Sequence, residues 1–245
     1  MNTEITLQRM SSMRLNAMKE LYYRALNEKN FPKYTLDEFI ALMVDTEWED
    51  REHRKIKRLT KNANFKINAH ENEIDYTSER NLNKDTFQRL MTLNFIKQTE
   101  NIIFTGPSGV GKSYLAQTIG NKACKQGIKT LFYYSADLME QLSMGKVNGN
   151  YPKIMAKINK ADLLLIDDFA LHPFTQEYTA ALMTIIEDRY ERAATIITSQ
   201  IPVNKWYQTF GEGTIADAIL DRIVYASHRI ELKGQSLRKR KVLKG

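Results

Sequence analysis

The sequence predicts an α/β protein in two parts, a small all-helical N-terminal domain and a larger domain built on a parallel β-sheet. Residues 1–65 carry apolar side chains at helical spacing, whereas from about residue 100 short apolar runs alternate with amphipathic segments. Alternation of strands and helices is typical of a parallel sheet covered on both faces. We therefore expect domains at 1–65 and 96–245, joined by a polar connector at 66–95.

The N-terminal domain is predicted to contain two helices separated by a turn around Pro32. The apolar positions of the first helix are Met18, Leu21, Tyr22 and Ala25, and those of the second are Leu36, Phe39, Ile40 and Met43. Thr35 and Glu38 have the spacing of a capping box at the start of the second helix. Farther along, acidic residues precede a basic run that ends at Lys61, an order that favours ion pairs within the helix.

The larger domain is predicted to contain five strands. They are expected at Asn101–Thr105, Thr130–Ser135, Asp162–Asp167, Thr195–Thr198 and Ser227–Leu232. Helices are expected between them at 112–126, 137–145, 176–192 and 214–225. The two most apolar strands, LLLID and TIIT, are expected to lie in the middle of the sheet because buried parallel strands are apolar on both faces.

Composition and charge exclude several classes of protein. The 245 residues are 42% hydrophobic and 27% charged, which suits a chain with a sizeable core. No apolar run approaches the roughly 20 residues that cross a bilayer, and the first residues carry no apolar leader, so we expect a cytoplasmic protein without a membrane. The net charge of +7 lies mostly in residues 96–245 and is compatible with an acidic partner such as nucleic acid.

The segment GPSGVGKS at residues 106–113 fits the phosphate-loop pattern at every specified position. It follows the strand NIIFT and opens a helix, which is the context that the pattern requires. Glycines allow successive N–H groups to surround phosphate oxygens, Lys112 would neutralise β- and γ-phosphate charge, and the Ser113 hydroxyl would ligate Mg²⁺. The expected nucleotide-binding residues are Gly106, Pro107, Ser108, Gly109, Val110, Gly111, Lys112, Ser113 and Tyr114.

A second motif, LLLIDD, places two carboxylates at the end of a buried strand. The carboxyl ends of parallel strands meet at one edge of a sheet, so both carboxylates are expected beside the phosphate loop. Asp167 would complete the Mg²⁺ ligands with Ser113, and Asp168 would orient the attacking water. Together the two motifs predict an ATPase that uses ATP and Mg²⁺.

The order of these motifs resembles that of the AAA+ superfamily. Such proteins carry a polar sensor residue after a strand that corresponds to 195–198, which here is Thr198, Ser199 or Gln200, with Ser199 taken as the catalytic candidate. The box LDRI resembles the one that carries the arginine finger, which implies that Arg222 acts in trans within a homo-oligomer; the alternative is a surface arginine paired with Asp221. Asp168 departs from the glutamate that most AAA+ proteins use to activate water.

The whole chain is similar to the IstB transposition helper ATPases, relatives of the DnaC-type helicase loaders. The residues that carry this resemblance are the segment LDEF…EW, the basic run after it, GPSGVGKSYLAQTIG, LLLIDDF, TIITSQIPV and GQSLR. The resemblance implies an oligomer that binds and deforms double-stranded DNA and recruits or stimulates a transposase. Only 11 residues follow Gly234, too few for the helical lid that comes after the last strand in many AAA+ proteins, so we expect no C-terminal helical lid.

Basic residues in three segments are candidate phosphate contacts, which would be tolerant of DNA sequence. They are Arg51, Arg54, Lys55 and Arg58 in the N-terminal domain, Lys153 and Lys157 before the acidic strand, and Arg238, Lys239 and Arg240 in the tail. The last two segments have an alternative role as solubilising surfaces, and the N-terminal helices have one as a structural cap on the ATPase. Two other functions remain open at this point, a replicative-helicase loader and a small-molecule P-loop kinase.

Overall fold

The computed structural model describes residues 3–29, 31–76, 78–210 and 213–237, and the chain divides into two compact units, 1–58 and 59–245. The N-terminal unit contains helices α1 (Thr3–Ser12) and α2 (Asn16–Asn27) and most of α3 (Leu36–Ala63). The capping box predicted at the start of α3 is confirmed, because the backbone N–H of Thr35 donates to Glu38 and that of Glu38 donates to the Thr35 hydroxyl.

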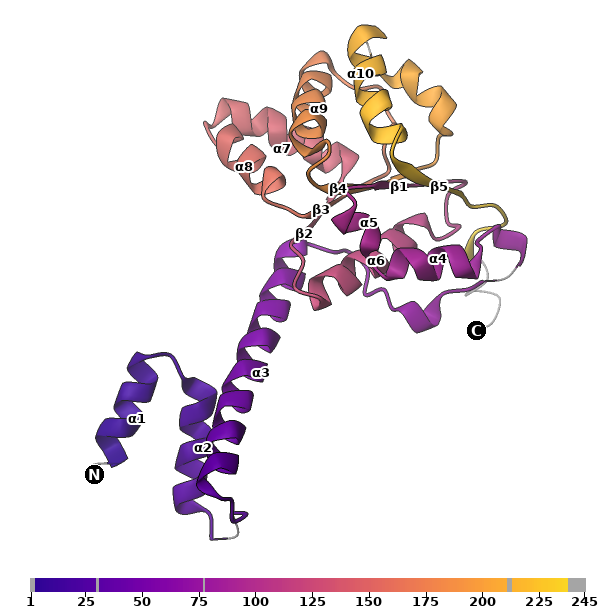
Figure 1. The fold of residues 1–245 in the computed structure, drawn as a ribbon. Coiled ribbons are helices and arrows are strands. Elements are labelled where there is room, and N and C mark those ends of the chain that lie inside the picture. Colours follow the sequence, from indigo (N-terminus) through magenta and orange to yellow (C-terminus); the bar gives the residue numbers. More distant parts are fainter. Residues whose placement is uncertain (1–2, 30, 77, 211–212, 238–245) are drawn as a thin grey trace. The chain divides into compact units, whose positions relative to one another are not determined.

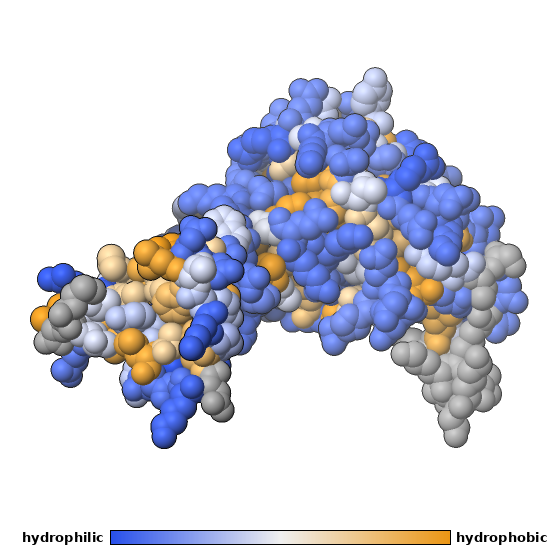
Figure 2. Space-filling model, turned by 60° about the horizontal axis from the view of Figure 1, so that its bottom comes forward, coloured by the Kyte–Doolittle hydropathy of each residue, from blue (hydrophilic) through white to orange (hydrophobic). Residues whose placement is uncertain are grey.

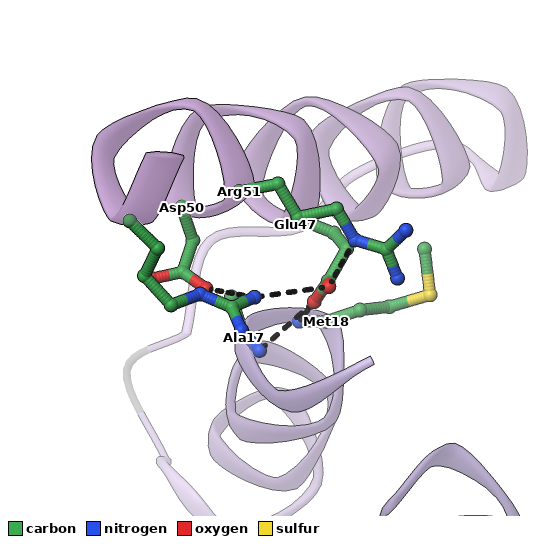
Figure 3. A network of polar contacts seen from close by, with 6 residues as sticks. Ala17, Met18, Glu47, Asp50 and Arg51 are labelled. Carbon is green, nitrogen blue, oxygen red and sulfur yellow. Dashed lines mark hydrogen bonds and ion pairs between the residues drawn. The ribbon is translucent and has the colours of Figure 1, made fainter. Parts of the chain in front are cut away.

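The N-terminal unit is organised around the buried carboxylate of Glu47 on α3 (Figure 3). Its Oε2 accepts hydrogen bonds from the backbone N–H groups of Ala17 (3.0 Å) and Met18 (3.3 Å) in the first turn of α2. Its Oε1 pairs with Arg51 Nε at 2.8 Å. Because α2 has no side-chain cap of its own, Glu47 supplies from another helix the acceptor that free helical N–H groups need.

Apolar side chains are exposed on the N-terminal helices, as the space-filling view shows (Figure 2). Along α3, Leu36, Ile40, Val44 and Trp48 recur every four residues and are 51–77% exposed. Among the described residues of the N-terminal unit, Glu47 is the only buried side chain. The unit therefore lacks the apolar core that stabilises most domains.

The second unit is built on a parallel sheet of five strands in the order β2-β3-β4-β1-β5. The strands are β1 (Asn101–Thr105), β2 (Thr130–Tyr134), β3 (Leu163–Asp167), β4 (Ala194–Ser199) and β5 (Ser227–Glu231). All five predicted strands are confirmed, and β3 and β4, the most apolar of them, lie inside the sheet. The parallel α/β class is therefore as predicted.

Helices cover both faces of this sheet (Figure 1). One face packs against α7 (Ser135–Val147), α8 (Tyr151–Asn159), α9 (Gln176–Arg189), α10 (Gly213–Val224) and the 3₁₀ segment Val203–Thr209. The other packs against α4 (Lys84–Met91), α5 (Asn94–Lys97) and α6 (Lys112–Lys125). None of the described helices is long and apolar enough to cross a membrane.

Residues 66–95 are not the connector that the sequence suggested. They form two 3₁₀ turns, Glu71–Glu73 and Ser78–Arg80, followed by α4 and α5, and belong to the second unit. Leu82, Phe87, Leu90 and Met91 are buried in the core beneath the sheet. The apolar residues of this segment are too sparse to form a helical pattern. Each of them instead fills a position in a core that the sheet and α6 mainly supply, and for that reason the prediction of a connector was wrong. The expectation of no C-terminal lid concerns chiefly residues 238–245, which lie outside the described residues.

Candidate nucleotide-binding site

The phosphate loop lies between β1 and α6 and has the backbone that its glycines allow. Gly106, Gly109 and Gly111 have φ values of +140°, +80° and +95°, which side chains with a Cβ rarely adopt. A Cβ on Gly106 would overlap the carbonyl of Leu232, and one on Gly109 would overlap Ser236. Glycine is therefore required here for backbone conformation and for close contact with the segment that follows β5.

The functional side chains of the loop lie at the start of α6. Lys112 is 5% exposed, and its Nζ donates to the carbonyls of Gly106 (2.8 Å) and Pro107 (2.9 Å). The Ser113 hydroxyl donates to Asp167 Oδ1 at 2.8 Å. Gly111 offers no side-chain cap to α6, and the positive end of the α6 dipole lies at this place and favours an anion there.

Asp167 ends β3 and Asp168 follows it, as the sequence predicted. Burial raises the pKa of Asp167, and hydrogen bonds from Thr198 and Ser113 oppose that increase. Asp168 Oδ1 accepts from Gln200 Nε2 at 3.2 Å, and the φ of Asp168 is +53°, an uncommon conformation for a residue with a Cβ. The carboxyl end of β3 thus presents one buried carboxylate beside Ser113 and a second one held in a strained turn.

Ser199 does not lie where the sequence analysis placed it. Its hydroxyl donates to the carbonyl of Phe169 at 2.6 Å and accepts from the indole of Trp206 at 3.2 Å, and the residue is fully buried. Successive residues of a strand point to opposite faces, so Ser199 points away from the carboxylates while Thr198 points toward them. Thr198 donates to Asp167 and Gln200 donates to Asp168, so these two residues, rather than Ser199, reach the acidic pair from the end of β4.

A cavity of about 510 Å³ borders the phosphate loop. One part of its lining comes from the loop, the start of α6 and the end of β3, and consists of Ser108, Gly109, Gly111, Lys112, Ser113, Tyr114 and Asp168. A second wall comes from residues 66–95 and consists of Ile67, Glu73, Ile74, Asp75 and Arg80. A site with cationic, backbone N–H and apolar parts has the chemistry for a nucleoside triphosphate.

The cavity wall formed by residues 66–95 was not predicted, because the sequence suggested that this segment is a connector. Buried Gln117 on α6 holds this segment through hydrogen bonds from the backbone N–H groups of Lys66 (2.8 Å) and Ile67 (3.0 Å). The Tyr114 hydroxyl donates to Glu73 at 2.6 Å and accepts from the N–H of His70 at 2.9 Å. Isolated isoleucines in a polar stretch were the only sign of this wall in the sequence.

Arg222 lies on α10 away from the phosphate loop. Its Nε pairs with Glu187 on α9 at 2.8 Å, rather than with Asp221, and its guanidinium lies 5.7 Å from the centre of the Tyr190 ring. The side chain remains 26% exposed. Within one subunit, Arg222 therefore binds its own surface and does not line the nucleotide cavity.

The candidate DNA contacts fall in different environments. Arg51, Arg54 and Lys55 each pair with an acidic residue on α3, which reduces the positive charge available to a phosphate. Other candidates are exposed: Arg58, Lys153 and Lys157. Arg238, Lys239 and Arg240 lie outside the described residues.

The phosphate loop, the acidic strand end and the five-stranded parallel sheet define a P-loop nucleotide-binding protein. The family model described as IstB-like ATP binding protein matches residues 7–245, and the chain belongs to this family.

Similar proteins come from insertion sequences. The chain is 36% identical over 234 residues to the insertion sequence ATP-binding protein y4pL of Sinorhizobium fredii, covering 96% of each chain. It is 32% identical over 201 residues to the ATP-binding protein of insertion sequence IS232 from Bacillus thuringiensis, covering 82% of this chain and 80% of that one.

Solved structures share the fold at lower sequence identity. The crystal structure of DnaI matches with a TM-score of 0.60 and 22% identity over 68% of this chain and 92% of that one. AMPPCP-bound DnaA from Aquifex aeolicus matches with a TM-score of 0.61 and 18% identity over 74% of this chain and 57% of that one. These likenesses concern the fold of the second unit, which carries the sheet.

Proposed function

We propose that this chain is an ATPase that serves transposition: it assembles on double-stranded DNA, hydrolyses ATP and recruits or stimulates a transposase. The observation that carries the ATPase part is the 2.8 Å hydrogen bond between Ser113 and Asp167, which joins the phosphate loop to the acidic strand end. The link to transposition is supported by the insertion-sequence relatives, which align over most of the chain.

The residues at this joint fit a bound Mg²⁺ and its nucleotide. Mg²⁺ prefers oxygen ligands and is often held by one or two protein groups together with phosphates and water. The Ser113 hydroxyl and the Asp167 carboxylate are such groups and already lie within hydrogen-bond distance of each other. The metal would neutralise phosphate charge, while Lys112 and the loop amides bind the β- and γ-phosphates.

Asp168 and Gln200 are proposed to orient the water that attacks the γ-phosphate. Asp168 lines the cavity, and its left-handed backbone conformation is the kind of strain that is found at functional sites. Gln200 donates to Asp168 and lines the same cavity, so it restricts the direction in which the carboxylate points. Of the three candidates for the sensor residue, Thr198 and Gln200, but not Ser199, are proposed to take that role, because both contact the acidic pair.

ATP turnover measured with and without duplex DNA tests this proposal. Lys112→Ala should abolish nucleotide binding, whereas Asp168→Asn should keep binding and slow hydrolysis by about 10²-fold or more. Lys125→Ala, a change to an exposed lysine on the same helix, is the matched control and should keep both activities. Wild-type protein that binds no ATP, or an Asp168→Asn variant with normal turnover, would contradict the proposal.

Arg222 is proposed to act as an arginine finger on the nucleotide of a neighbouring subunit. Arg222→Ala should then lose most ATPase activity, and mixing it with Lys112→Ala should restore part of that activity. Glu187→Gln is the decisive control, because it removes the partner of Arg222 within the subunit but keeps the arginine. If Glu187→Gln loses as much ATPase activity as Arg222→Ala, the ion pair between Arg222 and Glu187 has a structural role. The proposal of an arginine finger would then be wrong.

The N-terminal unit is proposed as the arm for assembly, DNA or a partner protein. Its exposed row Leu36, Ile40, Val44 and Trp48 and its lack of buried apolar side chains among the described residues favour association over an isolated fold. Sedimentation with ATP and duplex DNA tests assembly, and persistent monomers would contradict it.

A replicative-helicase loader is the second candidate, favoured by the fold shared with the DnaC helicase loader at a TM-score of 0.52. Competition between duplex and single-stranded DNA separates the two functions, because a loader should prefer single strands. Capture with purified transposase or purified replicative helicase then identifies the partner.

A further inference from the structure

The side chain of Arg80 is buried beside the phosphate loop, in the segment that the sequence suggested was a connector. It ends the 3₁₀ turn Ser78–Arg80 and is only 4% exposed. A charged guanidinium is costly to remove from water unless protein atoms replace its hydration. A buried arginine at this place therefore calls for a structural or functional reason.

Arg80 joins the phosphate loop to the segment that forms the second wall of the nucleotide cavity. Its Nη2 donates to the carbonyl of Val110 in the phosphate loop at 2.7 Å, and its Nη1 donates to the carbonyl of Asp75. Val110 lies in the loop expected to hold phosphates, whereas Asp75 lines the cavity beside Ile74. Arg80 itself lines the cavity, so its planar fork holds the loop and this wall together.

The contact also affects how the loop amides point. The carbonyl of Val110 is bound by Arg80 and that of Gly109 by the backbone N–H of Leu237 at 2.9 Å. With these carbonyls held from the protein side, the loop keeps a backbone conformation in which N–H groups remain available to an anion. Gly111 fits this arrangement, since a Cβ there would lie 2.7 Å from Arg80 Nη2.

The turn that carries Arg80 is fixed to the chain after β5. The carbonyl of Arg80 accepts from the N–H of Lys233 at 3.0 Å, and Asn81 Nδ2 donates to the carbonyl of Glu231 at 2.8 Å. Gly234, at φ +91°, approaches so closely that a Cβ would lie 2.9 Å from the carbonyl of Glu79. The guanidinium is therefore placed by rigid neighbours on both sides.

We propose that Arg80 is a positioning residue for the nucleoside triphosphate, which it serves by tying the Val110 carbonyl of the phosphate loop to the Asp75 carbonyl of the opposite wall. The proposal rests on the proposed function, in which this cavity takes ATP. Lysine cannot replace arginine here, because a single ammonium lacks the fixed fork that reaches both carbonyls.

The test compares Arg80→Lys with Arg189→Lys in the full-length protein. Arg189 is the matched control: it is 2% exposed and donates to the carbonyls of Ile158, Ala161 and Ala194, but it does not line the nucleotide cavity. Arg80→Lys should weaken ATP binding about tenfold, the effect of losing one charge-assisted hydrogen bond. Arg189→Lys should bind ATP with an affinity within about twofold of the wild type, measured at a temperature where the variant is folded. The reason is that sites without shared partners act independently.

Steady-state kinetics separate positioning from loss of folded protein. A smaller folded fraction lowers the apparent kcat and leaves KM unchanged, whereas a positioning defect raises KM for ATP. We expect KM to rise about tenfold in Arg80→Lys and kcat to change less. An unchanged KM, or equal losses of affinity in Arg80→Lys and Arg189→Lys, would overturn the proposal.

A second variant covers the case in which Arg80→Lys fails to fold. Gly234→Ala keeps the arginine and displaces the turn that carries it, so it should raise KM for ATP in the same direction. Faster amide exchange at residues 78–81 would show that the turn is displaced in the folded Gly234→Ala protein. If KM for ATP then stays normal, the proposal is overturned. Wild-type protein without ATP binding would instead contradict the proposed function itself.

Discussion

The two units of this chain bury different kinds of atoms. The second unit encloses continuous apolar clusters on both faces of its sheet, and even its buried Arg189 is surrounded by backbone acceptors. Among the described residues of the N-terminal unit only Glu47 is buried, and large apolar side chains remain exposed. The first arrangement draws its stability mainly from apolar burial, whereas the described part of the second is held by a polar network around Glu47.

The largest effect is expected when the buried polar support of the second unit is removed. Arg189→Met would remove the guanidinium that donates to the carbonyls of Ile158, Ala161 and Ala194, and it should destabilise the protein by about 3 kcal/mol or more. Chemical denaturation measures this change. Arg192→Met, at an exposed position nearby, is the control and should change stability by less than about 0.5 kcal/mol.

A smaller loss is expected from the N-terminal unit when Glu47 is changed. Glu47→Gln weakens the cap on α2 and its pair with Arg51, at a cost of about 1 kcal/mol. Burial alone would raise the pKa of Glu47, but hydrogen bonds from Arg51, Met18 and Ala17 outweigh burial and lower that pKa. The contribution of Glu47 is therefore present above the unfolded pKa and is lost as the pH falls through the folded pKa.

Circular dichroism as a function of pH checks this prediction. Wild type and Glu47→Gln should differ in helix stability at neutral pH and converge in acid. Glu38→Gln, at the exposed capping box of α3, is the control and should have a smaller effect. A difference between wild type and Glu47→Gln that persists in strong acid would show that the charge of Glu47 is not the cause.

Asp167→Asn should have opposite effects on stability and function. Because burial raises the pKa of Asp167, its ionised form destabilises the folded protein at neutral pH, and this cost is absent below the unfolded pKa. The amide that replaces the carboxylate keeps an acceptor for Ser113 and Thr198, so we expect a gain of about 1 kcal/mol and a loss of Mg²⁺-dependent turnover. Thermal unfolding without nucleotide and an ATPase assay measure the two effects. A destabilised variant would contradict this account of the site.

The smallest change in stability is expected at the exposed row of α3. Trp48→Ser should alter the unfolding free energy by less than about 0.5 kcal/mol, because the side chain is 66% exposed. The same change should lower self-association or partner binding, which sedimentation velocity measures. His53→Ser, at another exposed position of α3, is the control. Equal association of wild type and Trp48→Ser would remove this row from the proposed assembly surface.

The prediction from sequence was most accurate where local pattern and tertiary environment agree. The strand LLLID and the loop GPSGVGKS carry their own structural preferences, so β3, the phosphate loop and α6 form where expected. The prediction was wrong where long-range packing decides. Residues 66–95 have little apolar pattern, yet they supply one wall of the cavity. Ser199 belongs to β4, and the alternation of side chains along this strand turns it away from the carboxylates.

The sequence by itself determined the parallel α/β class, the phosphate loop and the position of the two carboxylates, because spacing and glycine chemistry act over a few residues. Only the tertiary structure decided that Thr198 and Gln200 contact the acidic pair, that Arg222 binds Glu187, and that Arg80 joins the loop to the opposite wall. Arg80 and Val110 are 30 residues apart, and their contact depends on the chain after β5 to hold the turn in place. Such contacts arise from the packing of distant segments, for which a local pattern contains no physical cause.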